Sequence, residues 1–213
     1  MGFLLSSHSV SLQRNQFLSV NPKKEISKWQ SNTFEGGAII SPDEKTKIRI
    51  DQLKNFGYVG ETTVVAPGIN GKMSEIHAAF GLLQLKHIEE TLAKRKIVDS
   101  TYRENLKNVQ GINCLNEPSE VVSNYAYFPI LIDEGYSISR DELNQRMKDI
   151  GINPRRYFYP LVTEYPMYRG LISANLENLP NANIASQQIL CLPIYPDLAI
   201  ETVKEISDFI ARQ

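Results

Sequence analysis

The segment Arg155–Pro160, which reads Arg-Arg-Tyr-Phe-Tyr-Pro, gathers two cations, two phenols and a rigid turn residue. Guanidinium groups bind phosphate through paired hydrogen bonds, and tyrosine rings stack on planar groups while offering a hydroxyl. The segment could therefore hold a phosphorylated or sugar-like ligand. Eight of the ten tyrosines lie between Tyr125 and Tyr195. Because such clustering is also typical of aromatic packing in a small lobe, the local pattern leaves both interpretations open.

A second candidate lies in Pro67–Glu75, where Asn70 and Lys72 come just before an expected helix. Free N–H groups and the positive end of the helix dipole favour an anion at this point. An amide and an ammonium group beside them would complete a phosphate site. Simple capping of the helix by Asn70 or Ser74 is the alternative.

Other common catalytic motifs are missing from the sequence. It has no GxGxxG, no P-loop, no HExxH and no serine nucleophile elbow. His77 and His87 are ten residues apart on one expected helix, too far apart to bind one metal ion, so we interpret them as a packed and a solvated residue. A pair of glycines, Gly36 and Gly37, permits a tight turn or a close approach of a ligand to the backbone.

Composition narrows the class of protein further. The 213 residues carry 23 Lys and Arg against 24 Asp and Glu, and this net charge of −1 argues against a dedicated nucleic-acid binder. Cys114 and Cys191 are too few for a disulfide framework and lack zinc-site spacing. No apolar run approaches the roughly 18 residues of a membrane helix. We therefore expect a soluble, cytoplasmic protein without a metal site.

The elements that must position these residues alternate between helix and strand. Capping boxes, glycines and hydrophobic spacing predict a strand at 37–40, a helix that Ser41 caps and that runs to about 55, and a long helix over 74–108. Further along the chain, they predict a strand at 124–132, a helix that Ser139 caps and that stops at Gly151, an extended segment at 152–159, and helices at 180–190 and 200–210. Residues 6–31 are polar and show no period. This order indicates an α/β chain with a small α+β lobe after residue 111.

Four segments, in order, resemble the DegT/StrS-type sugar aminotransferases. They are Asn32–Ile39, Gly68–Leu85, Arg156–Leu161 and Leu192–Pro196, and the resemblance covers residues 32–213. It implies a partial aspartate-aminotransferase fold. Residues 32–108 would be a remnant of the large domain ending in a long linking helix, and 109–213 would form the small C-terminal domain. Residues 1–31 are expected to be a non-matching, poorly ordered leader.

The resemblance also implies an activity. Members of the family bind pyridoxal 5′-phosphate on a lysine and move an amino group from glutamate to a nucleotide-linked keto-sugar. They are homodimers, in which Asn70 would reach across the interface to the partner's cofactor phosphate. Tyr157, Tyr159 and Arg156 would bind the substrate. The motifs resemble members that aminate a dTDP-3-keto-6-deoxyhexose for deoxysugar or surface-polysaccharide biosynthesis.

The family's Schiff-base lysine is the position at which this sequence departs. In the family, this lysine lies three residues before the asparagine that opens the first segment. In the present sequence that position is Trp29, and Lys28 is the nearest candidate for the lysine. We expect the chain to be the C-terminal half of such an enzyme, as a truncated gene produces, and to show no visible absorbance with the cofactor. The alternative is a non-catalytic remnant that binds a partner protein or a nucleotide-sugar.

Overall fold

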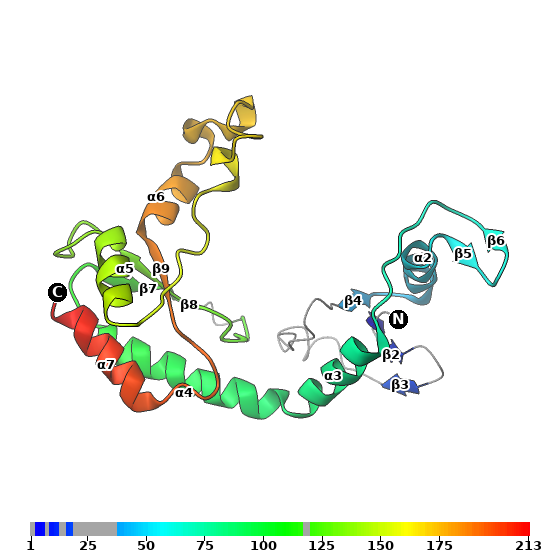
Figure 1. Ribbon diagram of the computed structural model, residues 1–213, viewed down its shortest axis with the longest axis horizontal. Helices are drawn as coiled ribbons and strands as arrows, with labels where there is room; N and C mark the ends of the chain where they lie inside the picture. Colours follow the sequence, from blue (N-terminus) through cyan, green and yellow to red (C-terminus); the bar gives the residue numbers. More distant parts are fainter. Residues whose placement is uncertain (1–2, 7–8, 13–15, 19–37, 117–119) are drawn as a thin grey trace. The chain divides into compact units, whose positions relative to one another are not determined.

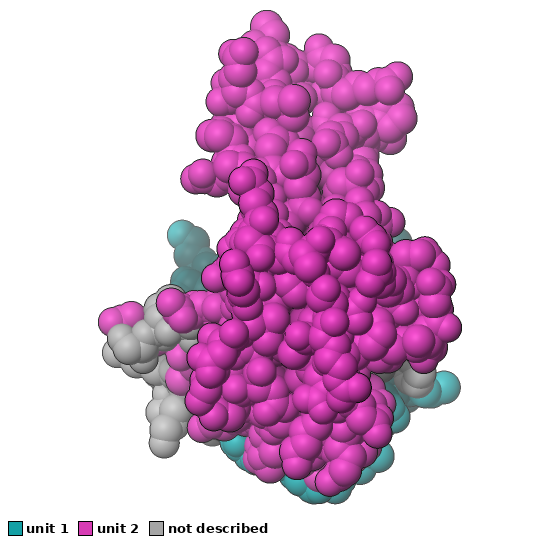
Figure 2. Space-filling model, turned by 90° about the vertical axis from the view of Figure 1, so that its left-hand side faces the viewer, with its two compact units in different colours: residues 1–90 teal, residues 91–213 magenta. Residues whose placement is uncertain are grey.

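A computed structural model describes residues 3–6, 9–12, 16–18, 38–116 and 120–213, which fall into two compact units, residues 1–90 and 91–213 (Figures 1 and 2). The first unit contains β1 (Phe3–Ser6), β2 (Ser9–Leu12), β3 (Gln16–Leu18), β4 (Ala38–Ser41), α2 (Glu44–Lys54), β5 (Tyr58–Val59), β6 (Thr63–Val64) and α3 (Glu75–Lys86). Its four-stranded sheet has the order β3-β2-β1-β4, with β1 and β4 parallel and in the register Leu4↔Ile39. Strand β4 confirms the strand predicted near residue 40.

Helix α2 begins two residues later than the sequence predicted. Asp43, and not Ser41, is its N-cap: the Asp43 carboxylate accepts hydrogen bonds from Thr46 N at 2.8 Å and from Thr46 Oγ1 at 2.9 Å. Ser41 instead ends β4 and donates its hydroxyl to the Asp43 carbonyl at 2.6 Å. A carboxylate with two donors satisfies the helix start better than the more distant serine.

The helix predicted over 74–108 is two helices. Helix α3 ends at Lys86 and is capped by His87, whose N–H donates to Gln84 O at 3.0 Å, and α4 (Ile88–Leu106) follows at once. The boundary between the units falls at Glu90, inside α4. Val98, Tyr102 and Leu106 belong to the core of the second unit. The C-terminal half of the expected linking helix is therefore packed into that unit.

The second unit is a three-stranded antiparallel sheet with helices packed against it (Figure 1). After α4 it contains β7 (Ile112–Cys114), β8 (Phe128–Ile132), α5 (Arg140–Asp149), the 3₁₀ turns η2 (Val162–Glu164), η3 (Ile172–Ala174) and η4 (Leu176–Asn178), α6 (Pro180–Gln188), β9 (Ile189–Leu192) and α7 (Ile200–Ala211). The sheet order is β7-β8-β9, so β8 is central. The core draws on α4, the sheet, α5 and α7, and comprises Val98, Tyr102, Leu106, Ile112, Phe128, Ile130, Ile132, Leu143, Met147, Leu190, Leu192, Leu198, Val203, Ile206 and Ile210.

Local side-chain chemistry explains where the second unit differs from expectation. The strand predicted over 124–132 begins only at Phe128. Ser123 Oγ and Asn124 Oδ1 accept hydrogen bonds from Tyr125 N and Ala126 N, both at 3.2 Å, which turns the chain before the strand. Ser139 is the N-cap of α5 as predicted, and its hydroxyl accepts from Glu142 N at 3.2 Å.

None of the helices among the described residues combines the length and the apolar character that crossing a bilayer requires. In the same part of the chain, no group of three or more His, Cys, Asp and Glu side chains is arranged to hold a metal ion.

Candidate functional site

The segment around Asn70 is fixed by backbone hydrogen bonds to the end of α2. Ile69 N donates to Leu53 O at 2.8 Å, and Gly71 N donates to Lys54 O at 2.8 Å. Between them, Asn70 forms an antiparallel bridge with Asn55. The Asn70 side chain is exposed. Its position thus depends on the backbone, while its amide remains available for a ligand.

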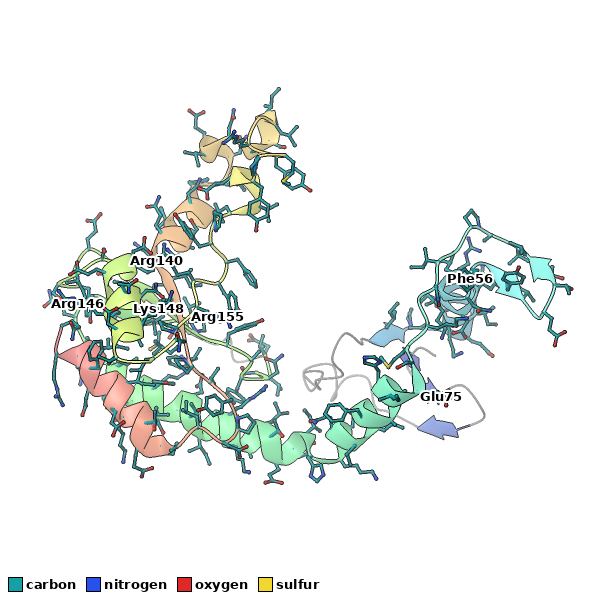
Figure 3. The ribbon with its side chains drawn as sticks, viewed as in Figure 1. Phe56, Glu75, Arg140, Arg146, Lys148 and Arg155 are labelled. Carbon is teal, nitrogen blue, oxygen red and sulfur yellow. The ribbon has the colours of Figure 1, made fainter. Side chains whose placement is uncertain are left out.

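The start of α3 is capped as the alternative interpretation predicted. Ser74 is the N-cap, accepts a hydrogen bond from His77 N at 3.3 Å and also contacts His77 Nδ1. Lys72 Nζ lies 5.1 Å from the centroid of the Phe56 ring. Figure 3 labels Phe56 and Glu75, which lie on either side of this segment in the sequence. Serine capping and a phosphate contact from Asn70 are compatible, because different groups make them.

Asn70 fits the cofactor contact that the resemblance implies. An exposed amide on a fixed backbone can donate to one phosphate oxygen from one side of a site. Lys28 and Trp29, which concern the Schiff-base lysine, lie outside the described residues.

In the second unit, the Arg155–Pro160 segment is joined to the edge of the sheet. Arg155 N donates to Cys191 O at 2.9 Å, and Cys191 N donates to Arg155 O at 2.7 Å, which forms an isolated bridge to β9. Burial raises the pKa of the Cys191 thiol, so the thiol stays protonated and uncharged at this junction. Within the segment predicted to be extended, 152–159, the residue that pairs with a strand is Arg155.

The aromatic side chains of this segment contact one another. The Tyr127 and Tyr157 rings meet edge to face, with centroids 5.4 Å apart, and the Tyr157 and Phe158 rings stack at 4.9 Å. Phe158 is 71% exposed. The group therefore lies at the surface rather than in the lobe's core, which favours the ligand-binding interpretation over plain packing.

Guanidinium groups surround these rings. Arg155 Cζ lies 5.8 Å from the Tyr157 centroid, and Arg156 Cζ lies 5.0 Å from the Tyr159 centroid. Arg140 Cζ is 4.8 Å from the same Tyr159 ring. Figure 3 labels Arg140 and Arg155. We call Arg140, Asp141, Arg155, Arg156, Tyr157 and Tyr159 the arginine–tyrosine cluster.

The charge of the arginine–tyrosine cluster suits an anion. It contains three guanidinium groups but one carboxylate, Asp141, which accepts a hydrogen bond from Arg156 Nη1 at 2.9 Å. Arg156 keeps other N–H donors, and phosphate is their preferred geometric match. The structure places Arg156 beside Tyr159, and it places Tyr157 beside Arg155 and Tyr127. Sequence reasoning missed Arg140 and Asp141, because both were assigned to a capping box.

Solved structures of similar fold define the class. DesI, crystallised in the presence of its TDP-sugar product, matches with a TM-score of 0.76 and 31% identity, over 85% of this chain and 46% of that one. The described residues therefore have the mixed α/β fold of about half of a pyridoxal-phosphate-dependent sugar aminotransferase. The chain belongs to the DegT/DnrJ/EryC1/StrS aminotransferase family, whose model matches residues 12–211. The match begins before Asn32, and so extends beyond the range that the motifs covered.

Two relatives carry the same name. The dTDP-4-amino-4,6-dideoxy-D-glucose transaminase of Escherichia coli is 59% identical over 180 residues, which are 84% of this chain and 48% of the relative. The transaminase of that name from Shigella dysenteriae is 41% identical over 182 residues, 82% of this chain and 49% of the relative. The chain thus spans about half the length of the curated relatives it matches. The family uses pyridoxal phosphate and acts on nucleotide sugars.

Proposed function

We propose that the chain carries the nucleotide-sugar site of an aminotransferase that acts at carbon 4 of a dTDP-linked 4-keto-6-deoxyhexose, with glutamate as the amino donor. The observation that carries this proposal is the 59% identity to the Escherichia coli transaminase. A match over 180 of 213 residues has to include both the Asn70 segment and the arginine–tyrosine cluster. The motifs alone suggested carbon 3, but both relatives are named for a 4-amino sugar, so we propose carbon 4.

The side chains divide the work of binding. The Arg155 and Arg156 guanidinium groups hold the diphosphate, and Tyr157 and Tyr159 orient the sugar or the base by stacking and through their hydroxyls. Asn70 donates its amide to the phosphate of the cofactor bound by the partner in a homodimer. Pyridoxal phosphate, when bound, supplies the electron sink for the transfer.

Calorimetric titration of the 213-residue chain with dTDP-4-amino-4,6-dideoxyglucose tests this proposal. We expect Tyr159→Leu and Arg156→Met each to weaken binding by about tenfold, because one charge-assisted or stacking contact is worth about 1–3 kcal/mol. Tyr168→Leu is the matched control, since Tyr168 is 44% exposed but lies outside the cluster, and it should leave affinity unchanged.

Two outcomes would contradict the proposal. An absence of heat at millimolar ligand would exclude a nucleotide-sugar site in this chain. Equal or tighter binding of the 3-amino isomer would exclude carbon 4.

Exposed apolar side chains favour a second candidate function, the binding of another copy of this chain as a protein partner. Val162, Met167 and Ile172 are 60, 67 and 86% exposed in the segment that precedes α6. This segment forms the projection at the top of the second unit (Figures 1 and 2). Exposed apolar patches of this kind mark interaction sites.

Sedimentation velocity tests this second candidate. The chain is expected to associate as its concentration rises, and Ile172→Glu should reduce that association by placing a charge in the contact. Ser173→Glu adds the same charge at the next exposed residue, and we expect it to have a smaller effect. Monomeric behaviour of the unsubstituted chain at every concentration would rule out self-association through this segment.

A further inference from the structure

Arg140 is a buried cation without a part in the binding scheme above. Its side chain is 4% exposed, although it lies in the first turn of α5. Its Nη1 donates to the carbonyls of Ser186 at 2.9 Å and Ile189 at 3.0 Å. These carbonyls lie at the C-terminal end of α6 and the start of β9, where a positive charge is favoured by the helix dipole. The guanidinium group is therefore held in a fixed place.

This fixed group reaches the cluster on two sides. Its Cζ lies 4.8 Å from the centroid of the Tyr159 ring. Its Nε lies 2.7 Å from Asp141 Oδ1, the same oxygen that accepts from Arg156 Nη1 at 2.9 Å. Arg156 in turn stacks on the Tyr159 ring at 5.0 Å. Arg140, Asp141, Arg156 and Tyr159 thus form a closed set of contacts.

The set has one rigid member and several exposed ones. Tyr159 is 43% exposed, and the side chains of Asp141 and Arg156 are 58 and 37% exposed. Exposed side chains sample several rotamers unless a fixed neighbour restricts them. A cation over an aromatic ring and a carboxylate bridge both restrict rotation. Among the four residues, Arg140 is the one that hydrogen bonds to backbone carbonyls of α6 and β9 hold in place.

We propose that Arg140 is a positioning residue: it orients the Tyr159 ring directly, and the Arg156 guanidinium group through Asp141. The proposal rests on the proposed function, in which these two residues bind the nucleotide sugar. The ligand touches Tyr159 and Arg156, and Arg140 acts on affinity only through them. Lysine cannot replace it, because a lone ammonium group has no flat face to stack on the Tyr159 ring and no second nitrogen to reach Asp141 while the first bonds to the carbonyls.

A double-mutant cycle on affinity for dTDP-4-amino-4,6-dideoxyglucose tests this role. Arg140→Met is expected to weaken binding by about tenfold, and Arg140→Lys by a similar factor. In a Tyr159→Leu background, Arg140→Met should weaken binding by clearly less than tenfold, because one of its two targets is gone and only Arg156 remains. Losses that multiply in the double variant would overturn the proposal. Arg146→Met is the control, since Arg146 projects from a different side of α5 (Figure 3) and pairs with Glu142 at 2.6 Å.

A second measurement separates this proposal from the function on which it rests. NMR spectra of chain labelled at tyrosine rings, with Tyr159 assigned from Tyr159→Phe, report the ring's surroundings without any ligand. The Tyr159 signals are expected to move toward those of a free tyrosine in Arg140→Lys, which keeps the buried charge, and to stay in Arg146→Met. Unmoved signals would refute the positioning role, whereas a chain that shows the shift but binds no nucleotide sugar would refute only the proposed function.

Discussion

Replacing Phe128 with alanine is expected to lower the free energy of unfolding of the second unit by about 3–5 kcal/mol. Phe128 is 1% exposed and opens the central strand β8. Its ring stacks on Tyr102 with centroids 4.9 Å apart, and Arg103 Cζ lies 5.4 Å from its centroid. The substitution removes these contacts and leaves a cavity that close-packed neighbours refill only in part. A domain of ordinary stability, about 5–15 kcal/mol, would lose a large share of it.

The same substitution is expected to weaken the candidate site. Phe128 pairs in register with Leu192, and Pro129 pairs with Cys191, the residue that bridges Arg155. The strand that holds the arginine–tyrosine cluster therefore depends on the packing of β8.

Urea unfolding followed by circular dichroism measures the loss of unfolding free energy in Phe128→Ala. Phe158→Ala is the matched control, because Phe158 is 71% exposed, and its cost should stay near 0.5 kcal/mol. Equal losses for the two alanines would contradict the assigned core.

In the first unit, Gly57→Ala is expected to displace the segment that carries Asn70. A Cβ atom at Gly57 would lie 1.7 Å from Ala66 O, and Gly57 has a φ of +84°. The positive φ alone costs a residue with a side chain about 1–2 kcal/mol. The clash with backbone adds to this, because a carbonyl cannot move aside as a side chain end can. The turn after α2 has to open, and with it the backbone contacts of residues 69–71.

Amide hydrogen exchange measures this displacement. The N–H groups of Ile69 and Gly71, which donate to Leu53 O and Lys54 O, should exchange faster in Gly57→Ala. Gly60→Ala is a close control, because Gly60 also has a positive φ, +70°, but nothing lies within 4 Å of its added Cβ. If Gly60→Ala accelerates exchange as much as Gly57→Ala, the close approach of Ala66 does not hold the Asn70 segment.

Elements whose signals lie within a few residues could be predicted from the sequence. Ser139 caps α5, and Gly151 follows that helix with a φ of +82°. The helices at 180–190 and 200–210 also correspond to α6 and α7, although α6 ends at Gln188 and β9 begins one residue later. Caps and turns are local interactions, so their sequence signatures carry the information. The break at His87 has no such signature, because the hydrophobic spacing continues across it.

For the candidate site, the sequence by itself determined the family and the segments that carry the proposed binding residues. Contiguous motifs carry Asn70, Arg156, Tyr157 and Tyr159, and a motif can be recognised before any fold is known. Only the tertiary structure decided that Arg140 lies over Tyr159, and that its guanidinium group bonds to Ser186 and Ile189. These partners are 19 to 49 residues away, beyond the reach of any helical or strand period. Their contacts exist because the antiparallel sheet and the packing of α5 bring distant segments together. Hydrophobic burial drives that packing, and because it is non-directional, no local sequence pattern specifies which distant residues will meet.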